Sequence, residues 1–420
     1  MYQVTRLPDS LTVATAEMPH MASVSLGLWV GVGGRHEPAA LNGVSHFIEH
    51  MLFKGTRRRS AKAISQAVEG IGGYLNAFTS EENTCFYSKA RHDRFDELLD
   101  VLMDMFLNSV FDPGEIDKER EVIKEELAMY LDQPHYHVQE LLNETLWPAH
   151  PLGRSLTGSE RSLDGLGRRQ MLAYQAQNYV TGSVLVAAAG NLRHENVVRA
   201  VRRNASRVRR GGRPAFEPFT GLQEGPRVSL VRKPTAQMQL ALGIRTCSRH
   251  DERRFALRLL NTLLGENMSS RLFQVLREDR GLAYSVQSNL SFFDDVGTMT
   301  VSAGLDTGNL REAMKLTMRE LRRCRDTAPT SAELRRARDY LVGQLDLSLE
   351  GTENQMMWVG EQWLAYNSIL SPAAAKRQLS SVTAGQVRAV ARDFFTRERL
   401  SLAMVSPLKS ARGLTDLLVP

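Results

Sequence analysis

Apolar residues recur at steps of three and four along residues 112–131, and this spacing predicts an amphipathic helix. The apolar stripe consists of Ile116, Ile123, Leu127 and Tyr130. Asp112 can cap the helix, Pro113 suits its first position, and Pro134 lies just past its end. The periodicity and the flanking residues therefore agree on one helix.

Two carboxylates border this stripe on one side. Glu119 and Glu126 are seven residues apart, so both side chains can face inward together. Most glutamates on such a charged helix are simply solvated, and the pattern alone leaves that alternative open for each of them.

A second helix is predicted around residues 46–50, which read His-Phe-Ile-Glu-His. The residues around the two histidines are apolar: Phe47, Ile48, Met51, Leu52 and Phe53. This helix is therefore expected to be largely buried. His46 and His50 project from one face, close enough to hold a single ion, and Glu49 lies beside them. The alternative is a helix with two surface histidines, but buried histidines need partners.

A catalytic zinc site needs neutral nitrogen ligands, an anionic ligand, an open position for water, and a carboxylate that takes a proton from that water. His46, His50 and Glu49 supply three of these parts, in the His-x-x-Glu-His order of the inverzincin signature. The missing ligand is expected from a carboxylate on a second buried helix, for which residues 112–131 are the best candidate.

The chain also contains an internal repeat. Residues 170–187 and residues 386–403 each lead from a helix into an apolar strand, at an offset of 216. Nearer the start of each half, residues 26–37 parallel residues 240–251 at an offset of 214. The repeat predicts an α+β fold of two similar domains, each with helices packed against a mainly antiparallel sheet.

Residues 209–226 are rich in Gly and Pro and have little periodicity, as is typical of a linker. We therefore place a catalytic domain at residues 1–219 and a second domain at residues 220–420.

The second copy lacks the metal-binding residues. An offset of 214 places Leu260, Leu263 and Leu264 at the three polar positions of the 46–50 motif. Leucine side chains can pack but cannot coordinate a metal, so only the first domain is expected to be catalytic.

Composition narrows the function further. The 53 basic residues are interspersed with 47 acidic ones, and no aromatic-basic recognition motif is present, so the net charge of +6 does not predict nucleic-acid binding. Three cysteines are an odd and sparse set that favours a reducing compartment. No apolar signal region and no run of membrane-spanning length occur, so we expect a cytoplasmic protein without membrane association.

The run from His46 to Thr56, together with residues 119–126, resembles the pitrilysin or insulinase-type zinc metallopeptidases. It is most similar to the subfamily of mitochondrial processing peptidase beta subunits and their bacterial relatives. In that family the third zinc ligand follows the second histidine by about 76 positions, and another essential carboxylate precedes it by seven. The resemblance implies that Glu126 is the third Zn²⁺ ligand and that Glu119 orients a metal-bound histidine.

Residues 72–79 resemble the family segment whose strand edge receives the substrate. This implies that Asn76, Ala77 and Phe78 bind a peptide at the cleavage point through backbone pairing. The alternative is an ordinary hairpin with residues 85–87 in its second strand.

Residues 269–284 resemble the family segment that carries an Arg and a Tyr seven positions apart. The resemblance implies that Arg277 and Tyr284 hold substrate backbone and help to stabilise the tetrahedral intermediate. On residues alone, a structural role for the pair stays open.

Taken together, the resemblance implies a zinc-dependent endopeptidase, with Glu49 as general base, that cleaves unfolded peptides or presequences inside a closed chamber. The alternative is a non-catalytic structural or substrate-presenting subunit of the same fold. Arg277 and Tyr284 lie in the second domain, so a chain of this length is expected to form a homodimer, or a heterodimer with a related subunit. In such a dimer the pair would reach the zinc site of the partner subunit.

Overall fold

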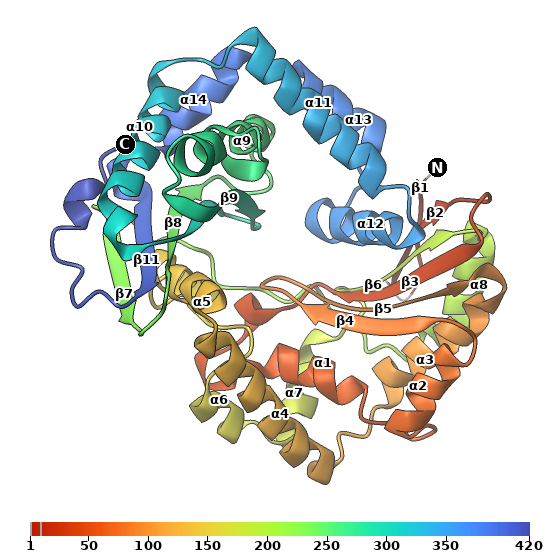
Figure 1. Cartoon of the computed structure of the whole chain (residues 1–420). Coiled ribbons are helices and arrows are strands. Elements are labelled where there is room, and N and C mark those ends of the chain that lie inside the picture. The colour runs from red at the N-terminus through yellow and green to blue at the C-terminus, as the bar shows by residue number, and fades with distance from the viewer. Residues whose placement is uncertain (1, 9–10) are drawn as a thin grey trace. The chain divides into compact units, whose positions relative to one another are not determined.

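The computed structural model describes residues 2–8 and 11–420, and the chain folds into two compact units (Figure 1). Unit 1 comprises Met1–Ala128, Arg154–Glu217 and Leu347–Ser371. Unit 2 comprises Met129–Gly153, Pro218–Asp346 and Pro372–Pro420. The main change from unit 1 to unit 2 thus lies near residue 220. In addition, each half of the sequence contributes one segment to the unit that the other half mainly forms.

Unit 1 contains a six-stranded sheet in the order β1-β2-β6-β3-β5-β4. The strands are β1 (Tyr2–Arg6), β2 (Thr12–Glu17), β3 (Ser23–Val30), β4 (Tyr74–Thr79), β5 (Thr84–Arg91) and β6 (Val184–Gly190). The β2–β6 pair is parallel, and the other neighbours are antiparallel. In this order β4 is an edge strand, with β5 as its neighbour in the sheet.

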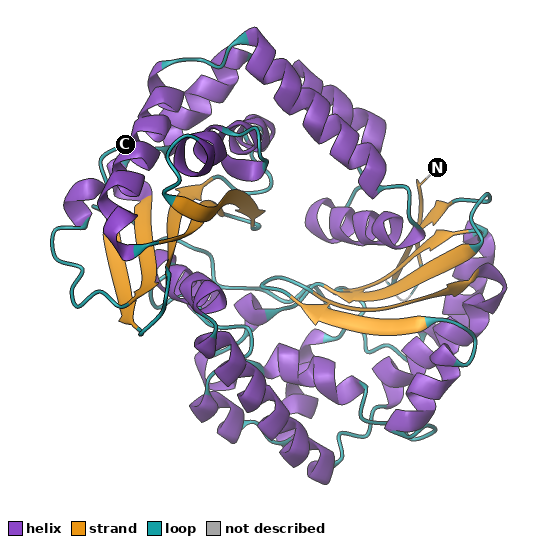
Figure 2. Cartoon of the chain, in the orientation of Figure 1, coloured by secondary structure: helices purple, strands orange, loops and turns teal. Residues whose placement is uncertain are grey.

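Helices cover both faces of this sheet, as Figure 2 shows. Those on one face include α1 (Val44–Leu52), α2 (Ala61–Glu69), α3 (Phe95–Asn108), α7 (Arg168–Asn178) and α8 (His194–Ala205). Beside them lie α6 (Glu160–Gly165) and most of α4 (Pro113–Asp132). On the opposite face, α12 (Thr352–Tyr366) packs against β2, β3 and β6. The central strands β2, β3 and β6 are therefore buried on both faces.

Unit 2 repeats this topology in a five-stranded sheet of order β7-β11-β8-β10-β9. The strands are β7 (Arg227–Arg232), β8 (Met238–Thr246), β9 (Ala283–Phe292), β10 (Gly297–Leu305) and β11 (Leu400–Ser406). One face is covered by α9 (Arg254–Asn261), α10 (Leu310–Asp326) and α14 (Ala384–Phe394), and the other by α5 (Pro134–Leu146). The remaining helices are α11 (Ser331–Ser348) and α13 (Pro372–Ser381).

Strand register confirms the internal repeat. Leu28 of β3 pairs with Val186 of β6, and Leu242 of β8 pairs with Leu402 of β11. The first residues of the two pairs differ by 214 and the second by 216, which are the two offsets found in the sequence. The predicted α+β fold with two similar, mainly antiparallel sheets is therefore correct.

The predicted helices also form where expected. Helix α4 runs from Pro113 to Asp132, and Oδ1 of Asp112 accepts hydrogen bonds from the backbone N–H groups of Gly114 and Glu115 at 2.9 and 3.2 Å. Among the described residues, no helix has both the length and the apolar character that crossing a membrane requires.

Candidate metal centre

Helix α1 presents its polar residues on one face because its other residues belong to the core. Phe47, Ile48, Met51 and Leu52 are each no more than 1% exposed. Their burial fixes the rotation of the helix about its axis. His46 and His50, four residues apart, therefore project together toward α4.

The structure brings His46, His50 and Glu126 together. The two Nε2 atoms lie 3.2 Å apart, and each is 3.8 Å from Oε2 of Glu126. Ligands at zinc distances of about 2.0–2.1 Å in a tetrahedron are roughly 3.3–3.4 Å from one another. The triangle in the protein is close to that size, and two imidazole nitrogens with one carboxylate form a known catalytic zinc set. These residues fit a zinc ion.

Glu119 and Lys54 support this cluster from behind His50. Oε1 of Glu119 lies 2.8 Å from Nδ1 of His50, and Oε2 lies 2.5 Å from Nζ of Lys54. A carboxylate at Nδ1 holds the proton on that nitrogen, so the lone pair of Nε2 points toward the cluster. The arrangement sets both the tautomer and the ring orientation of His50.

His46 is held in its neutral form. Burial, followed by repulsion from His50, lowers the pKa of His46 to about 3. A metal binds the neutral imidazole, so this environment leaves the nitrogen available at physiological pH.

Glu49 lies beside the cluster and is hydrogen-bonded to the edge strand. Oγ1 of Thr79 in β4 donates to Oε2 of Glu49 at 2.5 Å. Burial raises the pKa of Glu49, and the Thr79 hydrogen bond and His50 only partly offset this effect. A raised pKa makes a carboxylate a better proton acceptor than an ordinary one.

The segment predicted to bind substrate forms β4, so Asn76, Ala77 and Phe78 lie on an edge strand beside α1. The backbone N–H of Ser80 bonds to the carbonyl of Asn83 across the hairpin, whereas that of Ala77 bonds to its neighbour's side-chain oxygen, Oδ1 of Asn76, at 2.9 Å. Along an antiparallel edge strand the backbone groups point inward at one residue and outward at the next. Ser80 bonds inward across the hairpin, so the backbone groups of Ala77, three residues earlier, point outward. The Phe78 ring packs edge-on against Trp29 at 5.6 Å between centroids.

Arg277 and Tyr284 lie in unit 2. Arg277 is in the helical turn Phe273–Glu278, and Tyr284 is the second residue of β9. The guanidinium of Arg277 is 5.8 Å from the Tyr284 ring, and the tyrosine is 73% exposed. The two side chains are thus neighbours, and the tyrosine is open to a ligand.

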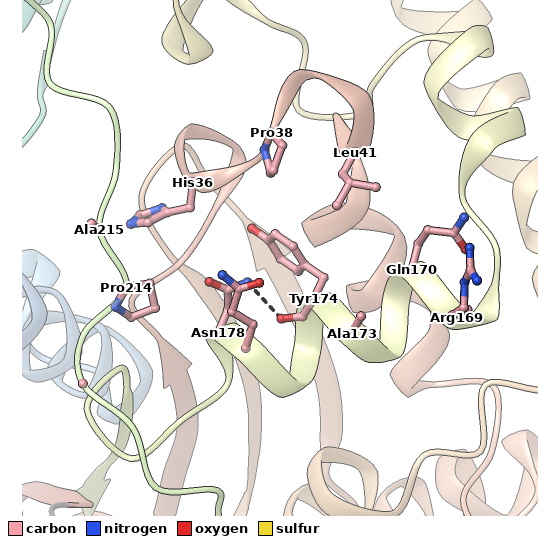
Figure 3. Close-up of a pocket in the computed structure, with 12 residues that line it drawn as sticks. His36, Pro38, Leu41, Arg169, Gln170, Ala173, Tyr174, Asn178, Pro214 and Ala215 are labelled. Atoms are coloured by element: carbon pink, nitrogen blue, oxygen red, sulfur yellow. Dashed lines mark hydrogen bonds between the residues drawn. The ribbon is translucent and has the colours of Figure 1, made fainter.

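Unit 1 also contains a cavity of about 600 Å³ along α7 (Figure 3). His36, Pro38 and Leu41 line it from one side, and Tyr174 and Asn178 from the helix. The Tyr174 hydroxyl is 3.2 Å from Oγ of Ser45, the residue before His46. This tyrosine links the wall of the cavity to the first turn of α1.

Sequence reasoning missed Lys54 and gave no role to Thr79. Lys54 directly follows the apolar run after His50. A cation at this place could have been predicted to pair with the carboxylate that is expected beside the histidines. Thr79 ends the strand predicted to bind substrate, and its contact with Glu49 depends on how β4 and α1 pack.

Two family models match the chain. The one described as Insulinase (Peptidase family M16) matches residues 12–160, and the one described as Peptidase M16 inactive domain matches residues 165–341.

Curated relatives extend over nearly the whole chain. A protein from Mycobacterium tuberculosis named as an uncharacterized zinc protease is 40% identical over 413 residues, which cover 98% of this chain and 94% of the relative. A protein from Bacillus subtilis with a similar name is 37% identical over 402 residues, covering 95% and 97%.

Solved structures share the fold at low sequence identity. A protease from Helicobacter pylori matches with a TM-score of 0.90 and 20% identity, covering 97% of this chain and 99% of that one. A chain of complex III2 from Candida albicans matches with a TM-score of 0.85 and 16% identity, covering 100% of both. Identities this low establish the common fold alone.

Proposed function

The chain belongs to the insulinase family of zinc proteases, peptidase family M16, and from this premise we propose that it is an active zinc-dependent endopeptidase. The observation that carries the proposal is the cluster of His46, His50 and Glu126, with Glu49 beside it. A relative that had lost catalysis would not need to keep both the ligands and the proton acceptor.

His46 and His50 would hold the zinc through Nε2, and Glu126 through a carboxylate oxygen. Zinc, when bound, supplies a Lewis acid that lowers the pKa of water and polarises the scissile carbonyl. Glu119 keeps the proton on Nδ1 of His50, and Lys54 neutralises the charge of Glu119 on the side away from the site.

Glu49 would move the proton. Oε2 is held by Thr79, so the remaining oxygen, Oε1, accepts a proton from the attacking water and delivers it to the leaving amine. The raised pKa of Glu49 suits this double task, because a strongly acidic carboxyl would accept the proton poorly.

The substrate would bind as an extra strand along β4. The outward backbone groups of Ala77 pair with an extended peptide, after the Asn76 side chain releases the Ala77 N–H. Asn76 and Phe78 then flank the cleavage point. Such pairing recognises backbone, so it favours unfolded peptides or presequences over folded proteins.

Arg277 and Tyr284 would hold the substrate backbone and stabilise the tetrahedral intermediate. We propose that they act on the zinc site of a partner subunit, in a homodimer or a heterodimer with a related chain. Substrate would then be enclosed in a chamber, in a protein that works in the cytoplasm.

The second candidate is a non-catalytic subunit that has a structural role or presents substrate. A chain of complex III2 shares this fold, so the fold alone is compatible with this possibility. The complete ligand set and the placement of Glu49 oppose it.

The metal content of the purified protein tests the proposal. We expect about one zinc per chain by elemental analysis, because two histidines and a glutamate converge. Glu126→Gln should remove most of that zinc, since it takes away the anionic ligand. A wild-type chain without zinc would favour the non-catalytic subunit, and unchanged zinc affinity in Glu126→Gln would mean that Glu126 is not a ligand.

A further inference from the structure

Helix α1 begins in an unusual way. The first N–H groups of a helix lack partners within it, and a Ser, Thr, Asp or Asn side chain at the preceding position normally accepts from them. Here that position is Gly43, with φ 91°. A Cβ on Gly43 would lie 2.8 Å from the carbonyl oxygen of Thr157, so no capping side chain fits.

The contact that excludes a side chain is reciprocal. Gly158 also has a positive φ, of 87°, and a Cβ there would lie 2.7 Å from the carbonyl oxygen of Asn42. The two backbones touch through a pair of glycines, which positions the start of α1 closely. The cap for this helix must therefore come from elsewhere in the chain.

Glu37 supplies that cap from the preceding loop. Its Oε2 accepts the backbone N–H of Gly43 at 2.7 Å, and its Oε1 accepts that of Ser45 at 2.8 Å. The side-chain amide of Asn42 donates to Oε2 at 3.2 Å and to the carbonyl of Ser155 at 2.9 Å. One carboxylate thus satisfies two N–H groups at the start of the helix.

This carboxylate is buried at a cost. Glu37 is 2% exposed, and burial raises its pKa although the hydrogen bonds from Ser45, Gly43 and Asn42 act in the opposite direction. Buried charges contribute little net stability compared with apolar residues of similar size, so fold stability is a weak reason for Glu37. The negative charge does interact favourably with the N-terminus of the helix dipole.

We propose that Glu37 is a positioning residue for the metal centre, which holds the first turn of α1 so that His46 stays in register with His50 and Glu126. Ser45 is fixed on both sides, by Glu37 at its N–H and by Tyr174 at its hydroxyl. His46 is the next residue, and its Nε2 depends on that turn for its 3.2 Å separation from His50. The inference rests on the proposed zinc function.

The test is the zinc affinity of Glu37→Gln, measured by competition with a chromogenic chelator. The variant keeps the size of the side chain, but its NH2 group opposes one of the backbone N–H donors. We expect the zinc dissociation constant to rise about 10- to 100-fold, the range found when groups that orient metal ligands are changed. Excess zinc should restore much of the peptidase activity.

Glu320→Gln is the matched control, because Glu320 is also 2% exposed but lies on α10 of unit 2. It should lower the melting temperature without changing zinc affinity. If Glu37→Gln fails to fold, Asn42→Ala, which removes the amide that holds the carboxylate, should weaken zinc binding in the same direction.

Two outcomes contradict the inference in different ways. If Glu37→Gln, or Asn42→Ala in its place, melts earlier but binds zinc as tightly as the wild type, Glu37 serves stability alone and the inference is wrong. A wild-type chain that binds no zinc overturns the proposed function itself, and the inference with it.

Discussion

Helices α1 and α9 occupy equivalent places in two copies of one topology, yet only α1 can bind a metal. The positions of His46, Glu49 and His50 are taken in α9 and the turn after it by Leu260, Leu263 and Leu264, each no more than 9% exposed. A buried leucine contributes about 1.5–3 kcal/mol to stability, whereas burial lowers the pKa of His46 and raises that of Glu49, which shows that burying these two groups is costly. The same fold therefore serves a site in one copy and a core in the other.

The first way to sharpen this comparison is Glu49→Gln. The substitution keeps the shape of α1 and both histidines but removes the proton acceptor. The second copy also lacks this acceptor, because Leu263 takes the place of Glu49. Peptide hydrolysis should fall by about 10² to 10⁴, measured with a fluorogenic peptide at saturating zinc. Zinc content should stay at the wild-type level, and near-normal turnover would remove Glu49 from the mechanism.

The second experiment is the substitution His46→Leu, which gives the first domain the residue type that the second domain has at the equivalent position, Leu260. Stability is measured after zinc has been removed by a chelator. The folded pKa of His46, about 3, lies below its ordinary 6.5, so the folded state resists protonation. The histidine's contribution to stability is complete above pH 6.5 and is lost as the pH falls toward 3. At pH 5 the loss is about 2 kcal/mol.

The free energy of unfolding of the wild type should therefore fall between pH 7 and pH 5 by about 2 kcal/mol more than that of His46→Leu. Urea titrations of both proteins at the two pH values measure the difference. Identical pH dependence would mean that His46 is protonated as easily when folded as when unfolded.

The third experiment asks whether the two domains cooperate between chains. Glu49→Gln and Tyr284→Phe, each inactive, are mixed under conditions that exchange subunits. A mixed dimer has one complete site if Tyr284 acts in trans, so an equal mixture should recover about a quarter of wild-type activity. No recovery in confirmed mixed dimers would mean that the pair acts within its own chain.

The sequence predicted the parts of the site that depend on local periodicity. His46, Glu49 and His50 share one helical face because the helix period places them there, and Asp112 caps α4 as its position suggested. Spacing along α4 made Glu119 and Glu126 candidates for facing inward. Choosing Glu126 as ligand required the family resemblance, since a stripe of glutamates does not say which one meets a metal.

Tertiary structure decided the rest. The exclusion of a side chain at Gly43, the remote cap from Glu37 and the contact of Thr79 with Glu49 all arise where separate segments approach closely. The placement of α5 in unit 2 and of α12 in unit 1 has the same origin. Sequence patterns report which face of an element is apolar, whereas the partner of that face is fixed only when all the elements pack together.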